Sequence, residues 1–535
     1  KRRFPSSQAA SGRYANAYSA APSKAGGRRR PGVTWVIALV LGAIYPLGHA
    51  PFHFLLLTLG SIAGFWLILD RYPSRALWLA WCYGIGKYAV GVSWIYVSIQ
   101  QYGGASVALA TFLVSLFVAF MALFCVPIGL LYRSYTGASL GFKALLFTAA
   151  WVTMEWALTW FLTGFPWLFA GFAMTDSPLA GFAPLLGVLG VSALTVASSV
   201  CIAMGICAYW KTRSLGSSLA IGLLPWGVGM ALGLVTWSVE VSRHEVALVQ
   251  GNIDQAIKWD ADQLRTNVER HWQLSEPHWD SDLIIWPEFA ITLYGREAEA
   301  IAARLQAKGM ASQTNVVAGM PGLELSPDAP GYRLYNLAQG FGQATGRFAK
   351  HHLVPFGDYV PLEQYLRGLI EFFDLPMSAA SRGPREQTNV QLTFNRPGGT
   401  EDVVQAAIGI CYEIAYGESL RRQAQEAGVL ITISNDTWFG ASIGPQQHMQ
   451  IARMRALESG RWLLRSTNSG VTGIVDAGGV IQQQLPQFQP AVLRGEFAVM
   501  SGQTPYVQLG DLPLLAFFGC FWLLFLLRWG SQESQ

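Results

Sequence analysis

The chain has 535 residues, of which 52% are hydrophobic and 13% are charged, whereas about 25% of an average soluble domain is charged. This composition predicts a membrane protein that carries a soluble part. The net charge of +4 is small for the length, and no basic stripe with interleaved aromatic residues occurs, which argues against nucleic-acid binding. No cysteine pair has the spacing of a metal site, so we expect neither a metal nor a cofactor.

The N-terminal residues 1–31 are rich in Ser, Ala, Gly and Arg, which is typical of a disordered basic tail on the cytoplasmic side. A cleaved signal peptide is the alternative. The apolar run beyond Arg30 lacks a clear small-residue cleavage site and is followed at once by more apolar segments, so we expect no cleavage. A membrane domain is expected over 32–239.

Long apolar runs predict eight membrane-spanning helices, seven of them in the membrane domain and the eighth within a C-terminal segment, 506–535. The first two are short and are joined by HAPFH, which predicts a tight hairpin. The eight runs lie at 33–48, 53–69, 76–99, 106–132, 143–162, 179–209, 217–238 and 511–528.

Basic residues are confined to alternate loops, and this asymmetry predicts the orientation of the helices. The loops at 49–52, 100–105 and 163–178 contain no Lys or Arg. Both termini are therefore expected in the cytoplasm, and the block 240–505 is expected outside, in the periplasm of a bacterium with two membranes. The basic residues lie in the N-terminal tail and at Arg71, Arg75, Arg133, Lys143, Lys211, Arg213 and Arg528.

Two charged residues, Lys87 and Glu155, lie inside predicted spans. An intramembrane charge is costly and is a candidate for function. The alternatives are a structural ion pair, or charges that a tilted helix lifts to the interface. The segment TGFPWL at 163–168 predicts an interfacial loop that is anchored by Phe165 and Trp167.

The pattern changes over 240–505, where short β-branched runs alternate with helical stretches. The strands read as nearly continuous apolar runs, which indicates an α/β domain whose sheet faces are covered by helices. Strands are predicted at 244–250, 282–288, 315–321, 403–410, 429–436 and 462–469, and helices at 260–275, 295–308, 415–427 and 443–459.

Cys411 is the only cysteine in this polar block, and the other five lie in apolar segments. It is either a nucleophile at the end of a buried strand or a small buried hydrophobe. Glu288 also follows an apolar strand, and Lys350 follows the strand-like YNLAQGF. A thiol, a carboxylate that takes its proton and an ammonium that holds an oxyanion suffice for acyl transfer. The alternative for Glu288 and Lys350 is a solvated surface charge.

The order WPE, then lysine, then GICYE resembles the nitrilase (carbon–nitrogen hydrolase) superfamily, which implies an αββα sandwich. With VQGNIDQAIKWD, KHHLVPFGDYVPLE and ISNDTWFG…GPQQHMQIARMRALE, the chain resembles the apolipoprotein N-acyltransferase family from about residue 33 to 528. That resemblance implies a membrane domain of eight spans joined to an αββα domain. It also implies acyl transfer from a membrane phospholipid to the N-terminal diacylglyceryl-cysteine of an apolipoprotein.

The resemblance also assigns roles. It implies that Glu288 is the base, that Lys350 stabilises the oxyanion, and that Cys411 is the nucleophile that carries the acyl chain as a thioester. Tyr412 and Glu413 match residues that the family needs, although Tyr412 could simply pack and Glu413 could orient Lys350 or a backbone N–H.

Further residues in the motifs are candidates for supporting roles. The resemblance implies that Trp259 and Trp438 line the acyl or headgroup pocket. The chain departs from the family at Asp358, where the family usually has Glu, so this carboxylate is one methylene shorter. We expect His448 to be structural, and Asn435 and Asp436 to hold loops in place.

The segment 365–377, YLRGLIEFFDLPM, suits a lid that dips toward lipid. We expect Phe372 and Phe373, together with the Phe165–Trp167 loop, to border the opening through which the donor lipid enters. Two other functions remain: a membrane-anchored nitrilase-type amidase that acts on a small soluble substrate, and an inactive scaffold that binds peptides. An anchor needs only one span, and a scaffold has no need for an intact Glu–Lys–Cys set.

Overall fold

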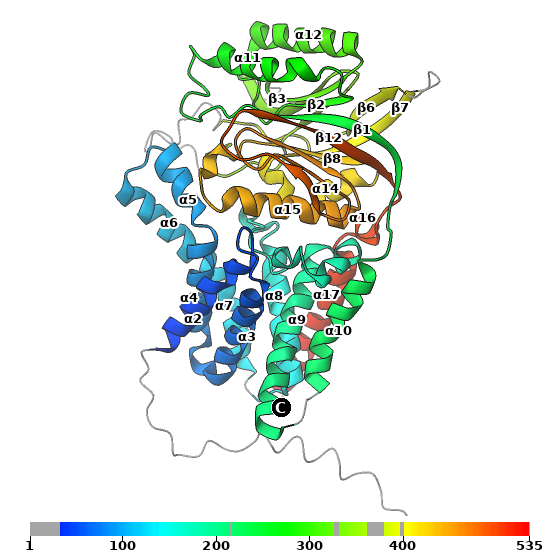
Figure 1. The fold of residues 1–535 in the computed structure, drawn as a ribbon. Helices are drawn as coiled ribbons and strands as arrows, with labels where there is room; N and C mark the ends of the chain where they lie inside the picture. Colours follow the sequence, from blue (N-terminus) through cyan, green and yellow to red (C-terminus); the bar gives the residue numbers. More distant parts are fainter. Residues whose placement is uncertain are drawn as a thin grey trace, which may run out of the picture.

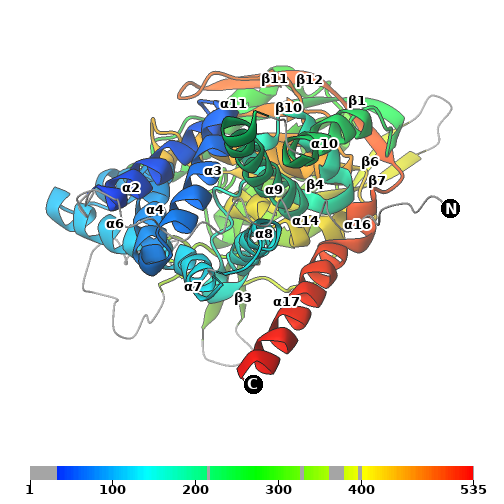
Figure 2. The same ribbon diagram turned by 90° about the horizontal axis from the view of Figure 1, so that it is seen from below.

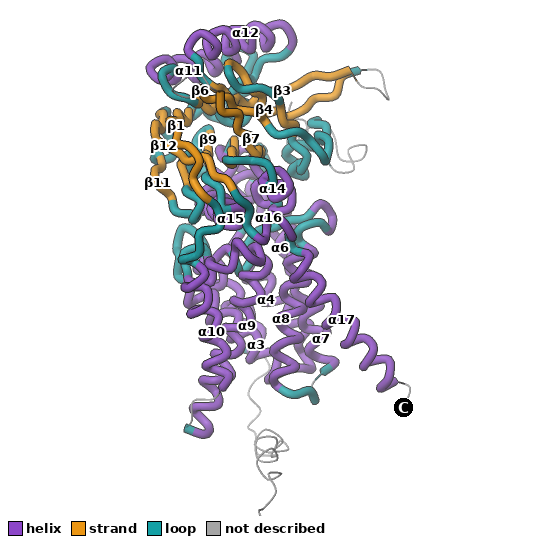
Figure 3. Tube along the Cα trace, turned by 90° about the vertical axis from the view of Figure 1, so that its right-hand side faces the viewer, coloured by secondary structure: helices purple, strands orange, loops and turns teal. Residues whose placement is uncertain are grey.

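The computed structural model describes residues 33–135, 137–213, 217–325, 331–360, 379–395 and 401–533. Helices form the lower part of the molecule and strands lie in the upper part (Figure 3). The tail predicted at 1–31 and the lid predicted at 365–377, with Phe372 and Phe373, lie outside the described residues.

The apolar runs of the N-terminal half form helices, since a helix satisfies its own backbone groups where no water is present. Each predicted span contains at least one helix, and Figure 2 shows these helices from below. They are α2 (Thr34–Ile44), α3 (Leu55–Arg71), α4 (Ala76–Gly91), α6 (Val107–Ala122), α7 (Val126–Ser134), α8 (Leu140–Ala157), α9 (Ala183–Thr212), α10 (Ser217–Leu232) and α17 (Leu512–Glu533).

Two segments of the described chain are long and apolar enough to cross a membrane, Val107–Ser134 and Pro178–Lys211. A third would be the pair Leu55–Arg71 and Pro73–Gly91, if these helices form one span despite the bend of 105° between them. The structure therefore has a helical region with two clear apolar spans.

The run predicted as a single span at 76–99 is broken in the structure. Helix α4 ends at Gly91, and the chain continues as α5 (Trp94–Val97) and the π-helical turn η3 (Ser98–Tyr102). The hydroxyl of Ser98 donates a hydrogen bond to the backbone oxygen of Trp438, at 2.7 Å. The segment after the break thus contacts the outer domain, a long-range interaction that hydropathy does not report.

The outer domain contains two six-stranded sheets. Strands β1 to β3 are parallel in the first sheet, and β7 to β9 are parallel in the second. The first sheet has β12 (Ala491–Ser501), β1 (Val239–Gln250), β2 (Leu283–Ile285), β3 (Asn315–Leu325), β4 (Tyr332–Gly342) and β5 (Arg347–Ala349) in that order. The second has β11 (Ile481–Gln484), β10 (Gly473–Val475), β9 (Leu463–Thr467), β8 (Val429–Ser434), β7 (Glu401–Ile410) and β6 (Val390–Asn395).

The two sheets pack face to face around an apolar core that includes Leu248, Ile285, Ile408 and Ile431. Helices α11 (Leu264–Ser275) and α12 (Gly295–Ser312) cover the outer face of the first sheet, at the top of Figure 1. Helices α14 (Gly417–Ala424) and α15 (Gly444–Ser459) lie between the second sheet and the helical region. The outer domain is therefore the predicted αββα sandwich.

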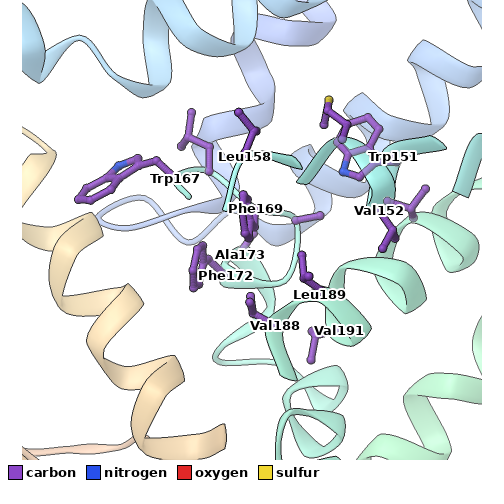
Figure 4. Close-up of a cluster of buried hydrophobic side chains, with 14 of the residues drawn as sticks. Trp151, Val152, Leu158, Trp167, Phe169, Phe172, Ala173, Val188, Leu189 and Val191 are labelled. Carbon is purple, nitrogen blue, oxygen red and sulfur yellow. The ribbon is translucent and has the colours of Figure 1, made fainter. Parts of the chain in front are cut away.

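The helical region and the outer domain share one hydrophobic core. Figure 4 shows part of this core, where aromatic side chains of the segment after α8 lie beside residues of α9. Trp167 donates its indole N–H to Gln447 on α15, at 2.7 Å. At the kink of α9, where Gly187 has φ +64°, the N–H of Val188 is freed and donates to Glu458 on α15, at 2.7 Å.

The two charged residues inside predicted spans, Lys87 and Glu155, are fully buried within the protein. The ammonium of Lys87 has no hydrogen-bond partner among the described residues and faces the rings of Tyr45 and Trp151, at 4.6 and 5.2 Å. Glu155 accepts hydrogen bonds from Trp151 Nε1 and from the backbone N–H of Ala170, both at 2.8 Å. Glu155 thus holds the segment that carries Trp167.

Candidate active site

Three predicted site residues follow strands. Glu288 comes shortly after β2, Lys350 directly follows β5, and Cys411 directly follows β7. Carboxyl ends of strands in an α/β sheet are where such folds build their sites. Because the two sheets face each other, residues from both meet at one buried place.

Lys350 is at the centre of this site. Its ammonium lies 3.1 Å from Glu288 Oε1 and 2.8 Å from Asp358 Oδ2, and all three side chains are buried. Asp358 therefore reaches the lysine directly despite its shorter side chain. Burial alone would lower the pKa of Lys350, but Asp358 and Glu288 raise it well above its ordinary value, so the ammonium stays charged.

Glu288 is held by donors on both carboxylate oxygens. Oε1 accepts from Asn336 Nδ2 at 2.7 Å in addition to Lys350, and Oε2 accepts from the backbone N–H of Asn435 at 2.9 Å. Burial raises the pKa of Glu288, but Lys350, the Asn336 hydrogen bond and Lys258 outweigh it and hold the pKa below its ordinary value. The carboxylate is therefore ionised at neutral pH and able to accept a proton.

Cys411 starts the 3₁₀ turn η10 (Cys411–Ala415) with φ +55°, in the left-handed region that a non-glycine residue rarely adopts. Backbone strain of this kind clusters at functional sites. Burial, and then the charge of Glu288, raise the pKa of the thiol far above its ordinary value, while Lys350 opposes them. The resting thiol is therefore neutral, and it needs a base before it can attack.

Glu413 joins the turn after β7 to the segment after β5. Its Oε1 accepts from the backbone N–H groups of His351 and His352, at 2.7 and 3.0 Å, and its Oε2 accepts from Ile410 N at 3.0 Å. Burial raises the pKa of Glu413 to about 7, against the effect of these hydrogen bonds. These contacts match the alternative in which Glu413 orients backbone N–H groups.

Tyr412 packs beneath the nucleophile. Its buried ring lies 6.3 Å from the ring of Trp167 and 6.5 Å from that of Phe165. Trp167 is itself fully buried, so the expectation that this residue borders a lipid opening is wrong. The exposed large side chains of this segment lie earlier, at Trp160, Phe161 and Leu162, whereas Trp167 is covered by the outer domain.

The two tryptophans proposed for a pocket pack against different side chains. Trp259 packs against Phe289 and Tyr294, with ring centres 5.3 and 6.2 Å away. Trp438 lies 6.1 Å from Tyr102, at the junction with the helical region. Among the described residues, no hydrogen bond or ring contact joins either tryptophan to the Glu–Lys–Cys group.

His448 belongs to a buried network with Asp436 and Arg465. Its Nδ1 lies 2.9 Å from Asp436 Oδ1, and Arg465 donates to Asp436 Oδ2 at 2.7 Å. Burial, and then the charge of Arg465, lower the pKa of His448. The backbone oxygen of Cys411 can only accept a hydrogen bond, so its contact with Nε2, at 3.1 Å, requires a proton on that nitrogen. The contact is with the backbone, as expected of a structural residue.

Two site residues escaped the sequence analysis. Asn336 lies within the strand-like YNLAQGF, where a polar residue in an apolar run was the available signal. Lys258 lies in QAIKWD next to Trp259, is buried, and donates from Nζ to the backbone oxygen of Glu288 at 3.1 Å. Burial lowers the pKa of Lys258 to about 8, although Glu288 and Cys411 oppose the shift.

A cavity of about 1170 Å³ lies at the junction of the helical region and the outer domain. Its apolar wall comes from the outer ends of membrane helices, and its polar wall comes from the outer domain. The apolar wall includes Trp156, Trp160, Leu189, Leu512 and Leu515, and the polar wall includes His352, Arg382, Arg385, Tyr416 and Arg421.

Comparisons with known proteins divide the chain, as the structure does, into a helical N-terminal region and an outer domain. Residues 245–506 match the carbon–nitrogen hydrolase family, and residues 41–201 match the apolipoprotein N-acyltransferase N-terminal domain. The αββα sandwich and the Glu–Lys–Cys group define the outer domain as a carbon–nitrogen hydrolase domain.

Relatives that match almost the whole chain identify a particular family within this class. The apolipoprotein N-acyltransferase of Pseudomonas paraeruginosa is 42% identical over 517 residues, which is 95% of this chain and 98% of the relative. That of Vibrio vulnificus is 38% identical over 493 residues, 90% of this chain and 94% of the relative. The chain belongs to the apolipoprotein N-acyltransferase family. Among solved structures, Saccharomyces cerevisiae Nit3 of the nitrilase superfamily has TM-score 0.34 and 17% identity, covering 48% of this chain and 91% of that one.

Proposed function

We propose that this chain transfers an acyl chain from a membrane phospholipid to the α-amino group of the N-terminal diacylglyceryl-cysteine of an apolipoprotein. The observation that carries the proposal is the 42% identity over 95% of the chain to a protein of that name. The site geometry supports it, because a buried ammonium between two carboxylates lies in electrostatic contact with a cysteine at a strand end.

In the first half of the reaction, Cys411 acts as the nucleophile. Glu288 takes the thiol proton as the sulfur bonds to the ester carbonyl carbon of the phospholipid. Lys350 stabilises the negative oxygen of the tetrahedral intermediate, an effect that is worth several kcal/mol in such sites. The bond from carbon to the glycerol oxygen then breaks, and the lysophospholipid oxygen takes the proton from Glu288. A thioester remains on Cys411.

In the second half, the uncharged α-amino group of the acceptor attacks the thioester carbon. Glu288 accepts a proton from the attacking nitrogen, and Lys350 again holds the oxyanion. The carbon–sulfur bond breaks, and the proton on Glu288 returns to the sulfur of Cys411. The products are an amide on the acceptor and the resting enzyme, so the two substrates react in turn.

For the membrane arrangement we propose all eight predicted spans, with both termini in the cytoplasm and the outer domain in the periplasm, at the inner membrane of a bacterium. The support is the alternation of basic and non-basic loops. The proposal keeps the four-part division of the chain at 1–31, 32–239, 240–505 and 506–535.

The cavity at the junction, whose lining does not include Glu288, Lys350 or Cys411, suits a phospholipid donor beside the site better than a small soluble amide. Its wall combines the apolar ends of membrane helices with the exposed arginines Arg382 and Arg385, which suits an amphiphile with a phosphate group. A small soluble substrate would need no apolar wall at the level of the membrane. A lid at 365–377, with Phe372 and Phe373 beside the donor, remains part of this proposal.

Intact-mass analysis of the purified protein, incubated with phospholipid and no acceptor, tests the proposed chemistry. We expect one added acyl chain on the wild-type protein and none on Cys411→Ser, because a hydroxyl is a far weaker nucleophile than a thiol. The Ser variant should keep the wild-type melting temperature. An acyl adduct that persists in Cys411→Ser would remove Cys411 from its role.

A further inference from the structure

Lys258 is a second buried ammonium in the active site, and the mechanism above leaves it without a role. Its side chain is 2% exposed and donates to the backbone oxygen of Glu288 at 3.1 Å. Among the described residues, no carboxylate lies within ion-pair distance of it. Burying an ammonium without a paired carboxylate is costly, so this lysine is a candidate for function.

The surroundings of Lys258 fix it against the residue that we propose as the base. The backbone oxygen of Lys258 accepts a hydrogen bond from Asn267 on α11, at 3.2 Å. The neighbouring Trp259 packs on Phe289, which follows Glu288 and has φ +49°. The Lys258 hydrogen bond therefore holds the turn that aims Glu288 into the site.

Glu288 and Asp358 are matched by two ammonium groups only when Lys258 is counted. Glu288 and Asp358 are the carboxylates in contact with Lys350, and Lys350 and Lys258 are the ammonium groups that act on Glu288. Without Lys258, two buried carboxylates would share one ammonium. Like charges that share a buried site favour uptake of a proton, and a protonated Glu288 could not take the thiol proton.

We propose that Lys258 is a positioning residue for acylation: its buried ammonium keeps the Glu288 carboxylate ionised and aimed at the thiol of Cys411. This inference rests on the proposed role of Glu288 as the base. The charge of Lys258 explains why Glu288, which is buried beside a second carboxylate, stays ionised at neutral pH.

The other groups around Glu288 come from several elements of the outer domain. Lys350 comes from the end of β5, Asp358 from the segment after it, Asn336 from β4, and the N–H of Asn435 from the end of β8. Cys411 directly follows β7, and the charge of Glu288 acts on its thiol. On the far side of Lys258, His271 of α11 is neutral at pH 7, because burial lowers its pKa to about 4. Removing Lys258 therefore removes one of two cations.

The test is the pH dependence of acylation. Full-length protein in detergent micelles is mixed with 1-palmitoyl-2-oleoyl-phosphatidylethanolamine, and the mass of the acyl-enzyme is followed with time from pH 5 to 9. In Lys258→Met we expect the acidic limb of the rate to move to higher pH by about 1 unit or more. The rate should fall about tenfold at pH values on this limb and recover at high pH.

Two further variants separate charge from structure. Lys258→Arg keeps the charge, so its limb should stay at the wild-type pH even if the larger side chain slows the reaction. Lys308→Met is the matched control, because Lys308 is a partly exposed lysine whose ammonium is 3.5 Å from Glu276. It should keep both the rate and the limb of the wild type.

A lower rate at every pH in Lys258→Met, with the limb unmoved, would overturn the inference and leave Lys258 a structural role. If the Met variant does not fold, Lys258→Gln takes its place; if neither folds, a shifted limb in Lys258→Arg would overturn the inference. Absence of any acyl-enzyme in the wild type would instead contradict the proposed function, so the two failures are distinguishable.

Discussion

At the scale of single residues, the site separates its charges so that the base is ionised while the nucleophile is not. Three hydrogen bonds and the nearby ammonium groups lower the pKa of Glu288 against its burial, and the same burial raises the pKa of Cys411. A neutral thiol beside an ionised carboxylate avoids two buried negative charges at rest. The thiolate needs to form only as the substrate carbonyl is attacked.

Asp358 should act through its negative charge. Its Oδ2 lies 2.8 Å from Lys350 and also accepts from Val354 N at 2.8 Å. We expect Asp358→Glu to keep acylation activity, since the carboxylate survives. Asp358→Asn should slow acylation by about 10- to 100-fold, because a lysine that moves misplaces the oxyanion site. Rates of acyl-enzyme formation measure both, and equal rates in the Asn and Glu variants would show that the charge is irrelevant.

The residues with reactive side chains in recognisable motifs could be predicted from the sequence. The residues that join the site only through contacts made by the fold could not. Glu288 and Lys350 were predicted from strand ends and motifs, and the structure puts them in contact. Lys258 carries no local pattern and Asn336 only a weak one, a polar residue in an apolar run, because the partners of both lie far along the chain. The catalytic roles of Glu288, Lys350 and Cys411 stay predictions.

At the scale of elements, the segment after α8 connects the helical region to the turn that carries Cys411. Glu155 of α8 holds the N–H of Ala170, and Trp167 binds Gln447 of α15 while it packs under Tyr412. A change in this segment is therefore expected to reach the turn that carries Cys411.

Trp167→Phe should disturb both stability and acylation. The variant leaves the buried oxygen of Gln447 without its donor, which costs about 1–3 kcal/mol, and the smaller ring loosens the packing on Tyr412. The control is Trp210→Phe on α9, because the Trp210 side chain is 69% exposed and lies outside the lining of the cavity, with an expected change within about 0.5 kcal/mol. Thermal unfolding and acylation rate are the measurements. Indistinguishable results for the two variants would deny the segment this role.

Element prediction succeeded where periodicity and composition decide the structure. All six predicted strands and all four predicted helices of the outer domain occur within a few residues of their expected places. The short strands β5, β6, β10 and β11 and the long β12 were missed, since they have weaker apolar patterns and are fixed by pairing with neighbours. The break after α4 was also missed, because hydropathy does not report the contact that the segment after it makes with the outer domain.

At the scale of the whole molecule, the helical region does more than anchor the outer domain. One buried core runs from α3 and α4 through α8 and α9 to α15, so the catalytic sheet is held in a fixed position over the helices. A cavity of about 1170 Å³ opens at the same junction. An enzyme that takes its substrate from a bilayer needs this fixed placement, because the reacting ester lies at the membrane surface.

This placement leads to a prediction about topology. In a background with Cys411→Ser and Cys520→Ser, which removes the site thiol and the exposed native thiol, single cysteines are introduced at Ser139 and Ala300. Ser139 is exposed before α8, and Ala300 is exposed on α12. In intact cells with a permeabilised outer membrane, an impermeant thiol reagent should label Ala300→Cys and leave Ser139→Cys unlabelled, since basic loops stay in the cytoplasm. Lysed cells should give labelling at both positions. Labelling of Ser139→Cys from outside would place the basic loops in the periplasm, and the outer domain could then not meet a periplasmic acceptor.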